Sequence, residues 1–232
     1  MGKSAVVRAT GGATTQATTP RPSRGEATRR QLIDAAIETL KDHGYAGASA
    51  RVIADRAGVN QGLIFYHFDS VTGLLLAALD AVGDRRRERY DAAVDGVRSP
   101  SELVEVASAI FREDLDAGYV GVLVAMIAGA ATTPGLGAAV AERIAPWTGF
   151  ARDAVAGVLA DSPLAGLVPA ESVGFAVVAL YLGMEMLTHL DGDRAPATAL
   201  FDQVLQFAGL LGGTGSTGGV AVATTPVSGA TS

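Results

Sequence analysis

Apolar residues recur at the spacing of an α-helix through nearly every segment between residues 23 and 211. Almost no segment alternates apolar and polar residues, which is the pattern of a half-buried β-strand. Gly, Pro, Ser and Asp residues interrupt the helical pattern at intervals, as they do where helices begin and end. The sequence therefore predicts an all-α fold.

The two ends of the chain lack this pattern. Residues 1–22 are mostly Ala, Thr, Gly, Pro and Arg, and residues 212–232 repeat Gly, Thr, Ser and Val. Neither segment carries enough apolar surface to offset the conformational entropy lost on folding. We expect both to be disordered tails.

Composition excludes several classes of protein. The chain has no cysteine, which rules out disulfides, thiolate metal clusters and a cysteine nucleophile. A long uncharged stretch, residues 117–141, is interrupted by Thr132, Thr133, Pro134 and Gly135, which leaves an apolar piece too short for a spanning helix of about 20 residues. The N-terminus lacks the apolar core of a signal peptide. We expect no transmembrane helix, no membrane partner and a cytoplasmic location.

The first helical segment has a readable start and stop. Ser23 and Glu26 have the spacing of a capping box, and Gly44 stands where a left-handed C-terminal cap is favoured. An apolar stripe between them indicates that the helix buries one face; it consists of Leu32, Ile33, Ala36, Ile37 and Leu40.

Two short helices follow in close succession. Ser49 can cap a helix over residues 50–57 that ends at Gly58, and Asn60 can cap a second helix over residues 61–68. Only three residues separate the two helices, with Val59 as an apolar plug, and this short connection suits the steep crossing of a helix-turn-helix. The second short helix is the candidate reader of DNA.

Charge is distributed unevenly along the chain. The formal net charge is −6, yet the first 68 residues carry nine basic and five acidic side chains, a net of +4, which leaves −10 for the rest. This asymmetry is typical of a small domain that meets a polyanion, although a solvated helix face gives differences of the same size.

Residues 30–74 read RQLIDAAIETLKDHGYAGASARVIADRAGVNQGLIFYHFDSVTGL. This segment resembles the DNA-binding domain of the TetR family of transcriptional regulators, most clearly in IADRAGVNQGLIFYHF and in the Gly-Tyr pair before the preceding helix cap. The resemblance implies an N-terminal three-helix DNA-binding domain with a helix-turn-helix, residues 23–70. A larger helical ligand-binding and dimerisation domain, residues 71–211, would follow it.

The resemblance also implies which side chains meet DNA. Base-edge or groove contacts are implied for Arg51, Gln61, Gly62, Leu63 and Phe65, and phosphate contacts for Ser49, Tyr66 and His67. We include the capping residue Asn60 in this set. The sequence departs from the family pattern twice, because Phe65 stands where Tyr is usual and Val71 where Lys is frequent.

Each of these residues also has a purely structural interpretation. Arg51 could pair with Asp55 one helical turn away, although a guanidinium at a helix start can also reach guanine. Gln61 could simply occupy the first turn of its helix, although an amide there can bond adenine. Leu63, Phe65 and Tyr66 could be core, and His67 could be a solvated or capping side chain. We favour DNA contact for Arg51 and Gln61.

The remainder of the chain predicts further helices, with prolines at the breaks. A long helix over residues 71–96 carries Arg85, Arg86, Arg87 and Arg89 interleaved with acids, which indicates a solvated face rather than a second DNA patch. The other predicted helices span residues 102–116, 119–131, 136–160, 171–190 and 197–211.

The last two predicted helices indicate a partner. The helix over 171–190 has no continuous polar face, and the helix over 197–211 is nearly as apolar. A chain of this size cannot cover both, whereas a second copy in a self-complementary four-helix interface would. The TetR resemblance implies a homodimer through the same two helices.

The resemblance further implies a small-molecule pocket among the middle helices. The bulky residues available to line it are Phe111, Tyr119, Met126, Trp147, Phe150 and Tyr181, although core packing explains each equally well. Glu185 and His189 share a helix face, but two ligands do not make a metal site. We expect no metal and no cofactor.

Three classes of function fit these observations. The first is a homodimeric DNA-binding regulator, a repressor released from a palindromic operator on double-stranded DNA by an unknown small-molecule effector. The second is an enzyme or a small-molecule-binding helical protein, but with three His, no Cys and no catalytic motif the sequence favours a non-enzyme. The third is an all-α homodimer without DNA-binding activity.

Overall fold

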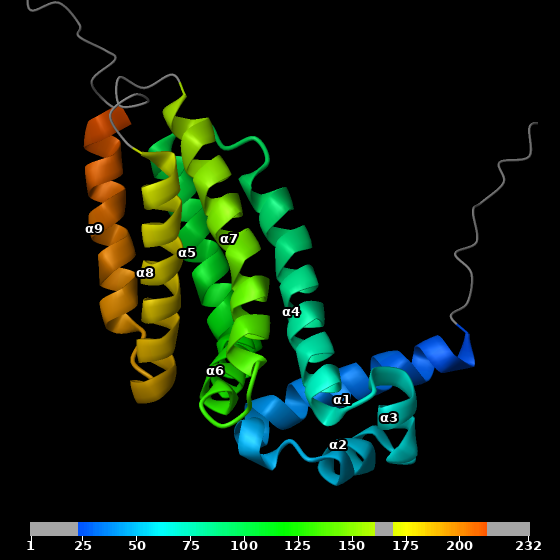
Figure 1. Ribbon diagram of the computed structural model, residues 1–232. Helices are drawn as coiled ribbons and strands as arrows, with labels where there is room; N and C mark the ends of the chain where they lie inside the picture. Colours follow the sequence, from blue (N-terminus) through cyan, green and yellow to red (C-terminus); the bar gives the residue numbers. More distant parts are fainter. Residues whose placement is uncertain (1–22, 161–168, 213–232) are drawn as a thin grey trace, which may run out of the picture.

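The computed structural model describes residues 23–160 and 169–212, and over these ranges the chain is a bundle of helices without strands (Figure 1). The prediction of an all-α fold is confirmed. In chain order the helices are α1 (Arg24–Gly47), α2 (Ala50–Ala57), α3 (Gly62–Phe68), α4 (Val71–Val94), α5 (Pro100–Ala117), α6 (Tyr119–Ala130), α7 (Leu136–Leu159), α8 (Ala170–Asp191) and α9 (Ala195–Gly212). The proposed tails, 1–22 and 212–232, lie outside the described residues except for Gly212, where α9 ends.

The predicted helix caps are present in the N-terminal domain. Ser23 Oγ accepts from the Glu26 backbone N–H at 3.3 Å while Glu26 Oε2 accepts from the Ser23 N–H at 2.7 Å, which completes the capping box. Ser49 Oγ accepts from the Val52 N–H, and Gly58 ends α2 in the left-handed conformation with φ 65°. Local sequence therefore fixes where these helices begin and end.

The helical backbone of α1 breaks at Gly44, as the sequence predicts. Gly44 has a positive φ of 64° and a non-helical ψ of −172°, and a short further turn continues from it to Gly47. The break precedes Tyr45, whose side chain contacts α6.

The helix-turn-helix is held against α1. Gln31 on α1 donates to the Ala57 carbonyl at the end of α2 at 2.6 Å. Ile53 and Ile64 are fully buried, and Val59 packs against the same core from the turn between the two helices. These contacts fix the position of α3 relative to α1 and α2.

One hydrophobic core runs through both parts of the chain. α1 packs against α4 and also against α6. The buried cluster continues from the N-terminal helices into α4, α6 and the start of α7, and its α4, α6 and α7 members are Leu74, Leu75, Ala78, Leu79, Val82, Val122, Leu123, Ala125, Met126, Leu136 and Val140. The two predicted domains are therefore joined by packing as well as by the chain.

Tyr45 makes the closest contact between α1 and α6. Its ring lies against Gly129, where any side chain would overlap it, and its hydroxyl lies 3.0 Å from Thr133 Oγ1. Nearby, the Lys41 ammonium lies 5.5 Å from the centre of the Tyr119 ring. The first three helices are therefore linked to the rest of the chain through α6 as well as through α4.

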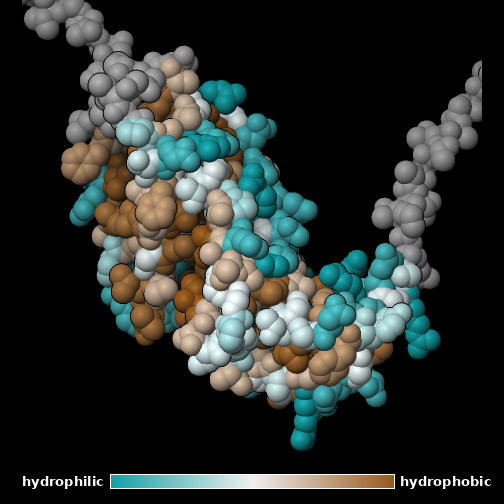
Figure 2. Space-filling view, viewed as in Figure 1, coloured by the Kyte–Doolittle hydropathy of each residue, from teal (hydrophilic) through white to brown (hydrophobic). Residues whose placement is uncertain are grey.

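The C-terminal helices stand beside one another and away from α1–α3. α8 packs against α7, and α9 packs against α5 (Figure 1). Figure 2 shows apolar side chains gathered over α8 and α9. The exposed large apolar residues of these two helices are Phe175, Val177, Leu180, Met186, Leu187, Leu190, Val204 and Phe207.

By length and composition α8 could cross a membrane, although the sequence predicts no transmembrane helix. In the bundle, however, α8 packs along α7 and carries the buried, charged Glu185. Helices of this length and composition also occur within the bundles of proteins that do not span membranes.

We predict that Gly129→Ala lowers the free energy of unfolding by about 1 to 3 kcal/mol, because the new methyl group overlaps the Tyr45 ring. Urea denaturation would measure it. Gly157→Ala on α7 is the control, since nothing lies within 4 Å of a methyl group there and alanine favours a helix. Full stability in Gly129→Ala would show that Tyr45 does not pack as described.

Candidate functional site

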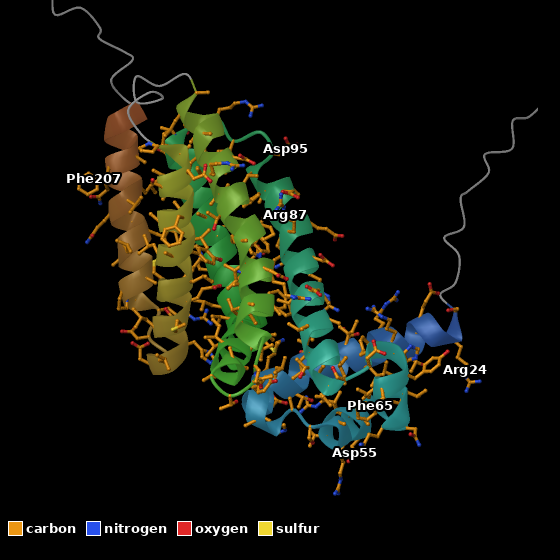
Figure 3. All side chains as sticks on the ribbon, in the orientation of Figure 1. Arg24, Asp55, Phe65, Arg87, Asp95 and Phe207 are labelled. Carbon is orange, nitrogen blue, oxygen red and sulfur yellow. The ribbon has the colours of Figure 1, made fainter. Side chains whose placement is uncertain are left out.

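The exposed surface of α3 carries most of the residues proposed to meet DNA. Phe65 is 48% exposed and Tyr66 79% exposed, which is unusual for aromatic side chains (Figure 3). Asn60, Gln61 and Gly62 are also exposed. Leu63 and His67 are half-buried, whereas Ile64 and Phe68 form the buried side of the helix. The interpretation of these side chains as core residues is therefore wrong for Phe65 and Tyr66 and holds in part for Leu63.

α2 adds Arg51 and Ser49 to this surface. The Arg51 side chain is 86% exposed, and its Nε lies 3.7 Å from Asp55 Oδ2. A long ion pair between two solvated side chains contributes little, so Arg51 is available to a polyanion. Ser49 Oγ and Asn60 Oδ1 both accept backbone N–H groups, from Val52 and Gly62, and serve as caps in this structure.

Basic side chains also stand at the start of α1. Arg24 and Arg29 are exposed, and Figure 3 shows Arg24 at the end of the helix farthest from the C-terminal bundle. The Arg29 guanidinium lies 5.1 Å from the centre of the Phe68 ring, which places it beside α3. Both cations can therefore reach the phosphates of a duplex that lies against α3.

A cavity of about 720 Å³ lies among the helices of the C-terminal part. Of the six bulky residues proposed to line it, the structure places four along its wall: Tyr119, Trp147, Phe150 and Tyr181. Other wall residues come from α4, α5, α8 and α9, and most are apolar. This volume suits a small organic molecule.

The other two proposed residues lie elsewhere, which corrects the sequence prediction. Phe111 is 2% exposed and packs with its ring centre 5.5 Å from that of Tyr181 and 5.4 Å from that of Phe201. Met126 is fully buried in the core that α6 shares with α1. Both face packed side chains, because the periodicity of a helix shows that a face is buried without showing whether a cavity lies beside it.

A buried charged cluster lies against one part of this cavity wall. Arg86 on α4 is 9% exposed, and its Nη2 lies 2.7 Å from Asp114 Oδ2 and 3.6 Å from Glu185 Oε1. The hydroxyls of Tyr90 and Tyr181 both donate to Asp114 Oδ2. The prediction that Arg86 belongs to a solvated face is therefore wrong, whereas Arg85, Arg87 and Arg89 do form surface ion pairs.

The cluster holds one cation and two carboxyl groups. Asp114 and Glu185 are fully buried, and three of their oxygens lack a hydrogen-bond partner among the described residues: Asp114 Oδ1, Glu185 Oε1 and Glu185 Oε2. Burial raises the pKa of Glu185 to about 7, with Arg86 opposing and Asp114 reinforcing the change. Burial likewise raises the pKa of Tyr90 and Tyr181, so both hydroxyls keep their protons.

Sequence reasoning missed this cluster and could have found part of it. Glu185 was considered only with His189, but His189 is exposed and the partner of Glu185 is Arg86, far away in the sequence. A carboxylate in the middle of the apolar helix α8 was the available signal, since such a group needs a buried partner. Among the described residues, no group of three or more His, Cys, Asp or Glu could hold a metal ion.

The geometry defines a class of protein: an all-α chain with an N-terminal helix-turn-helix and a C-terminal bundle around a cavity. Residues 32–78 match the family model described as bacterial regulatory proteins, tetR family. The match covers most of α1, all of α2 and α3 and the first turns of α4, and over these residues the chain is similar to the TetR family.

The similarity in sequence to individual proteins covers part of the chain. An uncharacterised HTH-type transcriptional regulator of Mycobacterium tuberculosis is 36% identical over 95 residues, which are 41% of this chain and 48% of that protein. The chain thus spans about half the length of this curated relative.

Solved structures extend the similarity of fold to the C-terminal bundle. A TetR-family transcriptional regulator from Cytophaga hutchinsonii has a TM-score of 0.70 at 19% identity, over 83% of this chain and 98% of that one. The regulator FadR from Bacillus subtilis, solved in complex with stearoyl-CoA, has a TM-score of 0.62 at 18% identity, over 77% of this chain and 96% of that one.

We predict different effects from two kinds of substitution at the DNA interface. Arg51→Ala or Gln61→Ala should weaken binding to a preferred site by roughly 1 to 3 kcal/mol and relax the choice of base there. Arg24→Ala should weaken binding to all sequences alike and reduce the salt slope by about one unit, because we expect Arg24 to contact phosphate rather than a base. Fluorescence anisotropy on specific and random duplexes would measure both. Equal losses on the two duplexes for Gln61→Ala would refute its role.

We also predict that Glu185 makes stability depend on pH. Its folded pKa of about 7 lies above its ordinary value of 4.5, so its contribution to stability is complete below pH 4.5 and lost as the pH rises through 7. Glu185→Gln, which resembles the protonated form, should raise the free energy of unfolding at pH 8 by on the order of 2 kcal/mol.

The comparison is made by urea denaturation of the parent and the variant at pH 5 and pH 8. The gain in Glu185→Gln should be much smaller at pH 5, where the parent keeps the proton. Glu171→Gln, on an exposed residue of the same helix, is the matched control. A gain for Glu185→Gln that is the same at both pH values would contradict this assignment.

Proposed function

We propose that this chain is a homodimeric DNA-binding transcriptional regulator, a repressor released from a palindromic operator by a small-molecule effector. The exposed surface of α3 carries the proposal, because Phe65 and Tyr66 stand open on a helix whose other side is firmly buried. The match of residues 32–78 to a family of bacterial regulatory proteins supports the same function.

The proposed dimer forms through α8 and α9. Phe175, Leu187, Leu190 and Phe207 are each at least 65% exposed. They belong to α8 and α9, which lie far from α3 (Figure 1). A patch of large apolar side chains on this scale favours a protein interface. A second copy would cover α8 and α9 with the same two helices and leave both α3 helices facing outward.

The proposed effector binds in the cavity. Tyr119 on α6 and Leu79 on α4 line it, and both helices also pack against α1. A bound effector can therefore act on the position of α3 through α4 and through α6. An effector changes DNA affinity only through its different affinity for the two arrangements, and couplings of about 1 to 3 kcal/mol are usual. We propose that the protein acts in the cytoplasm, without a cofactor and without catalytic activity.

The function is tested by selecting bound duplexes from random DNA. Two reading helices related by a two-fold axis enter successive major grooves about 34 to 36 Å apart, so we expect an imperfect palindrome. A single asymmetric half-site would contradict the dimeric arrangement, and no enrichment at all would favour the alternative of an all-α dimer without DNA-binding activity.

Leu187→Glu should break the dimer, because it places a charge in an apolar interface, and should weaken binding to the palindrome at least tenfold. Analytical ultracentrifugation and anisotropy would measure the two effects. Ile127→Glu is the matched control, since Ile127 is also an exposed apolar residue but lies on α6. If Leu187→Glu remained dimeric, α8 would not form the interface.

A further inference from the structure

We propose that the cavity selects amphipathic organic cations, molecules with an apolar body and a protonated amine or similar head, over anions of the same size. This inference rests on the proposed function in one respect, because it gives the chemical class of the effector proposed to bind in that cavity. It follows from the balance of charge around the wall and from the direction in which the polar groups of the wall point.

Above pH 7, where Glu185 is ionised, the interior of the wall carries a surplus of negative charge. Arg86 faces two carboxyl groups, those of Asp114 and Glu185, which lie behind the wall residues Arg86, Tyr90 and Tyr181. Because these groups are buried, water and salt screen their field much less than at a surface. A positive head group in the cavity would therefore be attracted, and a negative one repelled.

The polar atoms of the wall are better placed to accept than to donate. The Tyr181 hydroxyl donates its proton to Asp114 Oδ2 at 2.9 Å, which leaves its oxygen to accept from a ligand. Behind it, both oxygens of Glu185 have no hydrogen-bond partner within the described part of the chain. An ammonium, which only donates, matches such a wall.

The charged residues nearer the surface of the cavity do not reverse this balance. Arg143 is paired with Asp80 through contacts of 2.7 and 3.1 Å, and Arg87 is paired with Asp91 at 3.0 Å. The wall also includes Asp84 and Glu142, and neither forms an ion pair among the residues that the structure describes. Negative charge therefore exceeds positive charge both in the interior of the wall and near its surface.

The rival ligand is an anion that binds Arg86. Its head group would have to draw the guanidinium from Asp114, which is fully buried and would lose its positively charged partner. Removing one partner from a buried ion pair is costly. The aromatic rings around Arg86 already accommodate positive charge, since the guanidinium lies 5.5 Å from the centre of the Tyr90 ring and 5.4 Å from that of Trp147.

Trp147 is the only tryptophan in the chain and lines the cavity, so its fluorescence reports binding directly. The probes are decylamine, decanoic acid and decanol, below their aggregation concentrations at pH 8, where the first is a cation, the second an anion and the third neutral. We expect decylammonium to bind the full chain at least tenfold more tightly than decanoate, with decanol between them.

Three variants locate the effect. Glu185→Gln should reduce the preference for decylammonium over decanoate at least threefold, and the matched change Glu171→Gln on the same helix should leave it unchanged. Ala107→Phe places a ring in the cavity and should abolish binding of all three probes. Circular dichroism would establish that each variant is folded.

Several outcomes would overturn the proposal: tighter or equal binding of decanoate, no binding of any probe, an unchanged preference in Glu185→Gln, or full binding in Ala107→Phe. A separate gel shift with the selected duplex distinguishes failure of the proposed function from failure of the proposed ligand preference. Decylammonium that binds with the expected preference but leaves the DNA complex intact would support the cavity assignment and count against effector-driven release.

Discussion

The packing of α1 against both α4 and α6 is the interaction on which the rest of this structure depends. It places Leu32, Ile37 and Leu40 of the DNA-binding part in the same core as Leu75 and Met126 of the C-terminal part. Because protein interiors are close-packed and hardly compressible, a displacement of α4 or α6 cannot be absorbed between the two parts. The reading helix is thus mechanically continuous with the wall of the cavity.

The cluster of Arg86, Asp114 and Glu185 gives that wall its chemical character. Its members come from α4, α5 and α8, so it joins the helix that leads to α3 with the helix proposed to form the dimer. Buried ion pairs contribute little net stability compared with well-packed apolar residues. A cluster with two carboxyl groups for one guanidinium is therefore better explained by recognition than by stability, and it lies beside the cavity.

Much of the fold could be predicted from the sequence because its signals are local. Ser23 with Glu26, Ser49 and Gly58 set helix ends through contacts within a few residues, and the structure has all of them. The same holds for the apolar stripe of α1, in which Leu32, Ile37 and Leu40 are buried. Long-range partners could not be predicted: the pairing of Arg86 with Glu185, the contact of Tyr45 with Gly129 and the core positions of Phe111 and Met126 all depend on how the helices cross.

The claim of one continuous core is tested most directly by thermal unfolding followed with two probes. Circular dichroism reports all helices, including α1–α3, whereas the fluorescence of Trp147 reports only the cavity region. A shared core predicts a single cooperative transition with the same midpoint by both probes. Loss of a fraction of the helical signal at a lower temperature, with Trp147 fluorescence still native, would show that the DNA-binding helices unfold independently and would contradict this account.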